Sequence, residues 1–119
     1  MIVTVNGHDL ELELADNRSA QALVDLVGTD DLTLTMEDYG GFEKVGPLPQ
    51  RVPADDEQIT TGPGDVILYQ GDKLAIYYGT NSWSFTRLGR ITGLGEQELR
   101  RALGPGDISA TLWRSGTEG

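Results

Sequence analysis

The sequence contains no cysteine and only one histidine, His8. Without cysteine the chain has no disulfide bond, no thiol nucleophile and no thiolate metal site. With a single histidine, a Ser-His-Asp triad is not expected, and neither is a zinc site with several imidazole ligands. His8 directly follows the turn signal Asn6-Gly7, so we expect it to be exposed. The composition therefore predicts neither a metal nor another cofactor.

Basic residues are also scarce. The 119 residues include 9 Lys and Arg against 19 Asp and Glu, a net charge of −10. Residues 1–58 hold all of this excess, with 13 acidic and 3 basic side chains. Nucleic acids and anionic membranes bind clustered positive charge, and the only adjacent basic pair is Arg100-Arg101. We therefore expect no nucleic-acid or membrane partner, whereas docking of the acidic half onto a basic protein surface is one candidate function.

Long apolar runs are missing as well. No stretch of 18 apolar residues and no charged-then-apolar start is present, so we expect no transmembrane helix and no signal peptide, and predict a cytoplasmic protein. The acidic runs 30–31 and 55–57 lack the alternating ligand spacing of a calcium loop. The length predicts one domain over residues 1–119, as a monomer or a small homo-oligomer.

Glycine, in contrast, is plentiful, with 16 residues spaced between short apolar runs. This spacing is typical of β domains. Asn6-Gly7 predicts a type I′ hairpin turn between alternating segments. Apolar periodicity predicts one helix over 20–27, capped by Asn17 or Ser19 and ended by Gly28, and a second over 96–103. Further strands are expected at 32–36, 66–69, 74–78, 82–91 and 108–113.

Residues 38–58 show no sustained period and contain several glycines and prolines. Their 21 residues exceed the usual length of a structureless connection, so we predict a long loop that is functional, packed by its own apolar groups, or both. The runs 66–68 and 74–76 are apolar on both faces of a strand and need cover on both sides. The sequence as a whole predicts a mainly β fold, a closed barrel of about eight strands with two short covering helices.

Three residues of the expected strand 82–91 form a candidate binding surface. Trp83, Phe85 and Arg87 project to the same side of a regular strand, where a guanidinium beside aromatic rings can bind a carbonyl or carboxylate of a peptide or metabolite. The alternative is that the rings pack and Arg87 pairs with an acid of the long loop. Asn81 either donates to a ligand or secures a turn.

The glycine-rich part of 38–58 supplies further candidates. Tyr39, Phe42 and Glu43 lie in the expected loop, and loops carry binding residues more often than cores do. Phe42 can equally serve only to anchor the loop. With Tyr78, these residues complete a candidate ligand-binding set beside Arg87.

Several stretches together resemble a known family. The opening hairpin 7–16 (GHDLELELAD) and the following helix are similar to the start of cyclophilins. Uncharacterised bacterial cyclophilin-like proteins resemble the chain more closely, through 39–49 (YGGFEKVGPLP), 63–69 (PGDVILY) and 78–89 (YGTNSWSFTRLG). This resemblance covers nearly the whole chain and implies an eight-stranded cyclophilin-like barrel.

The resemblance implies less about activity. Cyclophilin prolyl isomerases carry an arginine with aromatic neighbours and a Phe-Met-x-Gln-Gly-Gly-Asp-like segment, whereas 67–72 here (ILYQGD) lacks the Phe-Met pair and one glycine. We therefore assign no catalytic residue. The leading hypothesis is a small binding module for a peptide segment or small molecule; prolyl isomerisation and acidic partner docking are the alternatives.

Overall fold

The computed structural model describes residues 1–28 and 30–114. Within these residues the chain forms nine strands and two helices. In chain order they are β1 (Ile2–Val5), β2 (His8–Leu14), α1 (Arg18–Val27), β3 (Leu32–Tyr39), β4 (Glu43–Pro47), β5 (Glu57–Thr61), β6 (Asp65–Tyr69), β7 (Lys73–Tyr77), β8 (Asn81–Thr92), α2 (Glu96–Leu103) and β9 (Ile108–Trp113).

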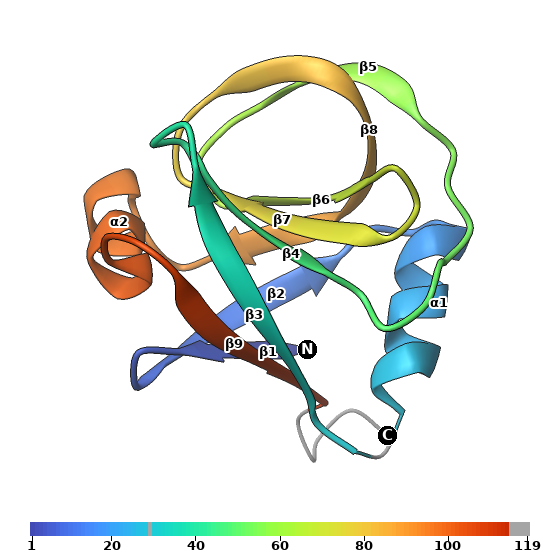
Figure 1. The fold of residues 1–119 in the computed structure, drawn as a ribbon, viewed down its shortest axis with the longest axis horizontal. Coiled ribbons are helices and arrows are strands. Elements are labelled where there is room, and N and C mark those ends of the chain that lie inside the picture. Colours follow the sequence, from blue (N-terminus) through green and yellow to red (C-terminus); the bar gives the residue numbers. More distant parts are fainter. Residues whose placement is uncertain (29, 115–119) are drawn as a thin grey trace.

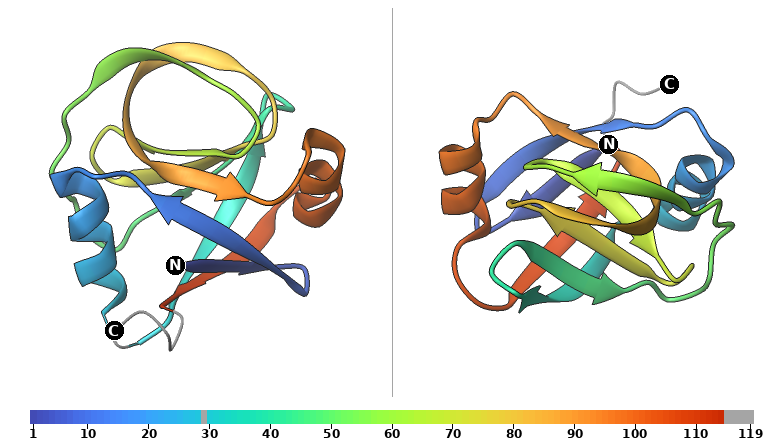
Figure 2. Two further views of the ribbon diagram at one scale, coloured as in Figure 1. Left: turned by 180° about the vertical axis from the view of Figure 1, so that it is seen from behind. Right: turned by 90° about the horizontal axis from the view of Figure 1, so that it is seen from above.

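Eight of these strands close into an antiparallel ring. The order is β2-β1-β9-β3-β4-β7-β6-β8, and pairing of β2 with β8 joins the two ends. Strand β5 lies outside the ring and pairs with the first half of β8, which arches away from the other strands (Figure 1). Figure 2 shows the same arch from behind and from above. The predicted closed barrel is confirmed, with β5 as an additional strand.

Local chemistry explains the elements that the sequence predicted well. Asn6 and Gly7 have φ values of +51° and +79°, as the type I′ turn requires. The Asn17 side chain caps α1 by accepting a hydrogen bond of 2.8 Å from the backbone N–H of Ala20. The helix ends at Gly28, where φ is +57°. Helix α2 and strand β9 have the predicted bounds.

The prediction of one long loop over 38–58 is wrong in its first and last parts. Strand β3 continues to Tyr39, a turn at Gly40-Gly41 with φ values of +63° and +75° follows, and β4 begins at Glu43. Strand β4 lacks a clear apolar period because its inward positions hold Lys44 and Gly46 in place of apolar side chains. A Cβ atom at Gly46 would lie only 2.5 Å from the Thr35 carbonyl oxygen. Strand β5 begins within the same stretch, at Glu57.

The middle of this stretch, residues 48–56, forms a strap beside α1. Leu48 and Val52 are buried, and the Val52 N–H donates to the Gly71 carbonyl at 2.9 Å. Arg18 of α1 holds the strap through Asp55, with an Nε to Oδ2 distance of 2.7 Å. The strap is therefore packed by its own apolar groups, which is one of the alternatives that the sequence predicted.

Two apolar clusters stabilise the fold. The larger fills the ring and includes the buried faces of α1 and α2, which lie on opposite sides of it (Figure 1). The smaller cluster consists of Ile67, Ala75, Tyr77 and Phe85. It lies between β6, β7 and the arch of β8. This second cluster positions the site described next.

Candidate functional site

A cleft of about 550 Å³ lies beside the smaller apolar cluster. Its lining comes from the ends of β3 and β6, from β4 and β7, and from the first half of β8. The lining residues are Tyr39, Glu43, Val45, Tyr69, Lys73, Tyr77, Asn81, Trp83 and Phe85. We call this the aromatic cleft.

Strand register determines the floor of the aromatic cleft. Residues that pair directly in an antiparallel ladder project from the same face of the sheet. Glu43 pairs with Tyr77, and Tyr69 pairs with Lys73, so these side chains share the outer face of β4, β7 and β6. The opposite face of the same strands points into the ring. The first half of β8 adds Asn81, Trp83 and Phe85 to the lining of the same cleft.

The aromatic rings form a continuous series. Tyr39 meets Phe42 edge-on, Phe42 stacks on Tyr77, and each of these centroid distances is 6.0 Å. Phe85 then contacts both Tyr77 and Tyr69 edge-on, at 5.9 and 6.0 Å. Such pairs add about 0.5–1.5 kcal/mol each beyond their buried area. The series holds the cleft walls in fixed positions.

Two aromatic side chains at the cleft remain exposed. Tyr39 retains 62% and Trp83 retains 58% of its accessible surface. Burying such a side chain stabilises a complex by about 1.5–3 kcal/mol. Two exposed aromatic rings at one hollow therefore offer a ligand a large apolar surface to cover. Leu94, at 37%, is the third large apolar residue exposed in the described chain, and it does not line the cleft.

The polar groups of the cleft cluster around Tyr77. Glu43 is 9% exposed and hydrogen-bonds with Tyr77, whose hydroxyl also accepts from Asn81 Nδ2 at 3.4 Å. Burial raises the pKa of Glu43 above its usual value, against a smaller lowering by the Tyr77 hydrogen bond. Burial raises the pKa of Tyr77 as well, so this phenol stays protonated at neutral pH.

Five of the residues that the sequence predicted for a binding surface line this cleft: Tyr39, Glu43, Asn81, Trp83 and Phe85. Phe42 lies behind the lining and stacks on Tyr77, so it anchors the hairpin between β3 and β4. The Tyr78 and Gly79 N–H groups both donate to the Phe42 carbonyl, at 2.9 and 3.0 Å.

Tyr78 lies apart from the aromatic cleft. It is buried in the larger cluster, and its hydroxyl donates a short hydrogen bond to Asp38 Oδ1. Lys44, which is fully buried, donates to the same oxygen at 3.1 Å and to the Gly106 carbonyl at 2.5 Å. Burial and the contact with Asp38 raise the pKa of Tyr78 to about 12. This cluster connects β3 and β4 to the turn before β9.

Arg87 is also outside the residues that line the cleft. It pairs with Ile67 in the β6–β8 ladder, farther along β8 than Phe85. Its Nη1 lies 3.9 Å from Asp65 Oδ2, and nearly half of its side chain is exposed. The structure thus pairs Arg87 with an acid, as the alternative interpretation expected, but with Asp65 of β6 and not with an acid of 38–58.

Sequence reasoning omitted Tyr69, Tyr77, Lys73 and Val45 from the candidate set. The continuous apolar runs 66–68 and 74–76 show that these strands have two apolar faces, but they do not show which face borders a cleft. The strand pairing of β4 with β7 and of β7 with β6 supplies that information.

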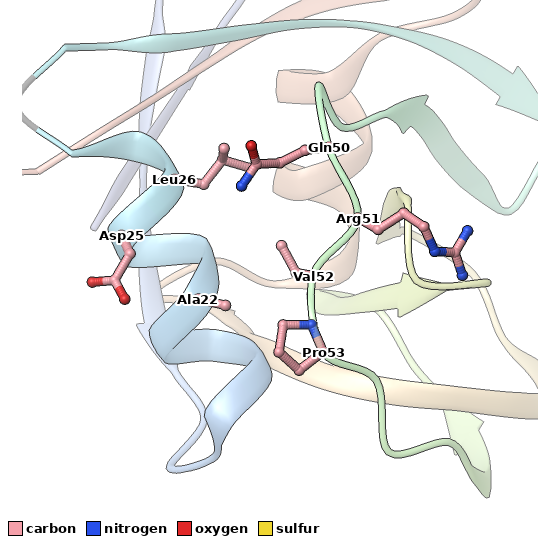
Figure 3. Close-up of a pocket in the computed structure, with 7 residues that line it drawn as sticks. All are labelled: Ala22, Asp25, Leu26, Gln50, Arg51, Val52 and Pro53. Atoms are coloured by element: carbon pink, nitrogen blue, oxygen red, sulfur yellow. The ribbon is translucent and has the colours of Figure 1, made fainter.

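A second hollow, of about 430 Å³, lies between α1 and the strap. Figure 3 shows Ala22, Leu26 and Val52 facing it, while the Asp25 carboxylate and the Arg51 guanidinium point away. Arg51 instead donates to the Gln70 carbonyl at 2.9 Å. Few polar groups converge here, and we regard the aromatic cleft as the stronger candidate.

Over 1–28 and 30–114, no group of three or more His, Asp or Glu side chains is arranged to hold a metal ion. In the same part of the chain, no helix has the length and apolar character needed to cross a membrane.

Comparisons with known proteins place the chain in a family. No curated protein sequence matches it. Among solved structures, McbB in complex with tryptophan superposes with a TM-score of 0.64 at 15% sequence identity. This match covers 99% of the present chain and 45% of McbB, so the chain spans less than half of that protein, and the likeness shows the fold alone. The model of the cyclophilin-like family matches residues 3–113, and the chain therefore belongs to the cyclophilin-like family.

Proposed function

We propose that this domain is a binding module that holds a small molecule, or a short peptide segment, in the aromatic cleft. The observation that carries the proposal is the pair of exposed rings, Tyr39 and Trp83, at a hollow that also contains a buried carboxyl group. Surface aromatic residues of monomeric domains are ordinarily scattered, and exposed apolar patches beside a hollow mark binding sites.

The size and lining of the cleft support the same conclusion. Small-molecule sites usually enclose roughly 300–1,000 Å³, with mostly apolar walls and a few polar groups that orient the ligand. The aromatic cleft, at about 550 Å³, lies within this range. Glu43 and Asn81 are the orienting groups, one an acceptor and the other an amide with both capacities.

The lining favours binding over prolyl isomerisation. The cyclophilin resemblance associates isomerase activity with an arginine among aromatic residues. The residues described as lining the cleft include no arginine, and Arg87 is paired with Asp65 elsewhere on β8. We therefore keep ligand binding as the proposed function.

A probe titration by NMR tests the proposal. Uniformly ¹⁵N-labelled protein is titrated with small aromatic compounds, including L-tryptophan, since McbB has a similar fold and was solved with tryptophan. Trp83 lines the cleft. Trp113 lies on β9, outside the cleft lining, where its Nε1 donates a hydrogen bond of 2.9 Å to Thr4 Oγ1 of β1. We expect binding probes to shift the Trp83 indole and Asn81 amide signals and to leave the Trp113 indole unchanged.

Two variants make this experiment specific. Trp83→Ala removes an exposed ring and should weaken probe binding at least tenfold without loss of the fold, because most of the ring is in solvent. Trp113→Phe, the matched control, should bind as the original protein does. Probe-induced shifts confined to the hollow between α1 and the strap, or no shifts with any probe, would contradict the proposal.

A further inference from the structure

The charge balance inside the aromatic cleft indicates the class of ligand. Two of its lining residues, Glu43 and Lys73, carry an acidic or a basic side chain. Lys73 Nζ lies 3.1 Å from Asp72 Oδ1 and 3.3 Å from Gln70 Oε1, so its charge already has a partner. Glu43 forms no ion pair with any residue of the described chain.

A carboxylate in this position is incompletely compensated. Glu43 is nine-tenths buried, and its neighbours in the strand ladder are the aromatic Tyr39 on β3 and Tyr77 on β7. The Tyr77 hydrogen bond stabilises the charged form only in part, since burial still raises the pKa of Glu43. A positive group beside a buried carboxylate gives a large favourable interaction, because little water screens it.

The aromatic walls favour the same kind of ligand. An organic cation within about 6 Å of a Trp or Tyr ring is attracted by the negative face of the ring. Tyr39, Tyr77 and Trp83 line the same cleft as Glu43, and Glu43 pairs with Tyr39 and Tyr77 in the strand ladders. The apolar surface of these rings can pack against a hydrocarbon or aromatic part of the ligand. The chain's net charge of −10 also raises the local concentration of cations.

We propose that the aromatic cleft selects a small organic ammonium ion, a free amine with an apolar or aromatic body, and that Glu43 is its counter-ion. This inference rests on the proposed function and adds the ligand class to it. The ammonium group pairs with the Glu43 carboxylate at the floor, while the body of the ligand lies against Trp83 and Tyr39 and covers their exposed surface.

The test compares two probes of the same shape. Phenethylamine and 2-phenylethanol share a ring and a two-carbon chain and differ in carrying an ammonium or a hydroxyl group. In NMR titrations at neutral pH and low salt, we expect the amine to bind at least tenfold more tightly than the alcohol. Raising sodium chloride from about 20 to about 300 mM should weaken binding of the amine and leave that of the alcohol unchanged.

A variant pair assigns the preference to one residue. Glu43→Gln keeps the side-chain shape and a hydrogen-bonding oxygen but removes the charge, so the preference for the amine should disappear. Binding of 2-phenylethanol then shows that the variant is folded. Glu11→Gln makes the same change of net charge at an exposed position of β2, outside the cleft, and should retain the preference.

The outcomes separate this inference from the proposed function. Equal affinity of the original protein for both probes would overturn cation selection while leaving the cleft as a binding site. A preference that persists in Glu43→Gln would overturn the role of Glu43. Tighter binding of Nα-acetyl-lysine-N-methylamide than of phenethylamine would overturn the small amine as the ligand and indicate the lysine side chain of a peptide. Failure of every probe to bind would overturn the proposed function itself.

Discussion

Lys44 illustrates how a single polar residue is accommodated inside the ring. Its partner in the β4–β7 ladder, Ile76, points into the ring, and Lys44 has no accessible surface. A buried ammonium is costly unless it is paired and hydrogen-bonded. Here Asp38 Oδ1 and the Gly106 carbonyl both accept from Nζ, and the Tyr78 ring centroid lies 5.5 Å away. Lys44 therefore joins three segments that are distant in sequence.

Asp38 provides the pH-dependent part of this cluster. The hydrogen bond from Tyr78, followed by the interactions with Lys44, holds the pKa of Asp38 below its usual value. Because the folded pKa is lower than the unfolded one, the carboxylate stabilises the fold above the unfolded pKa of about 3.9. That contribution is lost as the pH falls through the folded pKa.

We predict that Asp38→Asn lowers the free energy of unfolding at neutral pH and that the difference from the original protein shrinks below about pH 4. Urea denaturation at several pH values measures this. Asp30→Asn, at an exposed acid outside the cluster, is the control and should show no such trend. A difference for Asp38→Asn that is constant with pH would contradict the assignment.

At the scale of elements, the hairpin between β3 and β4 positions one wall of the aromatic cleft. Its tip carries Tyr39 and Phe42 and is attached to the end of β7 through the Phe42 carbonyl. The attachment needs a glycine at position 79, because a Cβ atom there would lie 2.7 Å from Phe42 Cβ and 3.2 Å from Phe42 Cα.

We predict that Gly79→Ala displaces the hairpin tip, costs roughly 1–3 kcal/mol of stability through overpacking, and weakens probe binding in the cleft. Denaturant titration and the NMR probe titration measure the two effects. Gly62→Ala is the matched control, since a Cβ atom at Gly62 meets nothing within 4 Å. Unchanged Tyr39 and Phe42 signals in Gly79→Ala would contradict the role given to this contact.

The sequence predicted those elements whose ends are determined by local chemistry. Asn6-Gly7 specifies the first turn, and α2 and β9 follow from apolar spacing after clear turn signals. Strand β4 was not predicted because its two inward positions hold the buried Lys44 and, where the Thr35 carbonyl approaches, Gly46. Strand β5 is mostly exposed and exists through its pairing with β8, which no local pattern specifies.

The same distinction applies to the candidate site. Residue type and position in the sequence predicted Trp83 and Glu43 as binding residues, and both line the cleft. Tyr69 and Tyr77 belong to strands with two apolar faces, and only the long-range register shows which face is covered. Arg87 has the same parity as Trp83 on the strand, but parity does not show which part of β8 borders the cleft. Arg87 lies outside the lining and pairs with Asp65.

At the scale of the whole molecule, closure of the strand ring stabilises the fold, whereas the net negative charge destabilises it. The pairing of β2 with β8 closes the eight-stranded ring, so every strand of the ring pairs with two ring neighbours over at least part of its length. The net charge of −10 opposes compaction through self-repulsion, which salt screens.

We therefore predict that added sodium chloride raises the melting temperature by a few degrees, equivalent to roughly 1 kcal/mol or less. Thermal unfolding followed by circular dichroism, from low salt to about 0.5 M, measures this effect of screening. A melting temperature that falls with salt would show that the ion pairs, such as Arg18–Asp55, outweigh the repulsion.

The aromatic cleft is the proposed ligand-binding site of this cyclophilin-like domain. A crystal structure of the complex with the tightest probe from the NMR panel would show whether a ligand occupies it. We predict density for the probe between Trp83, Tyr39 and Glu43, with the ammonium of an amine probe within hydrogen-bond distance of the Glu43 carboxylate. A probe bound against α1 and the strap, with the aromatic cleft left empty, would contradict the claim.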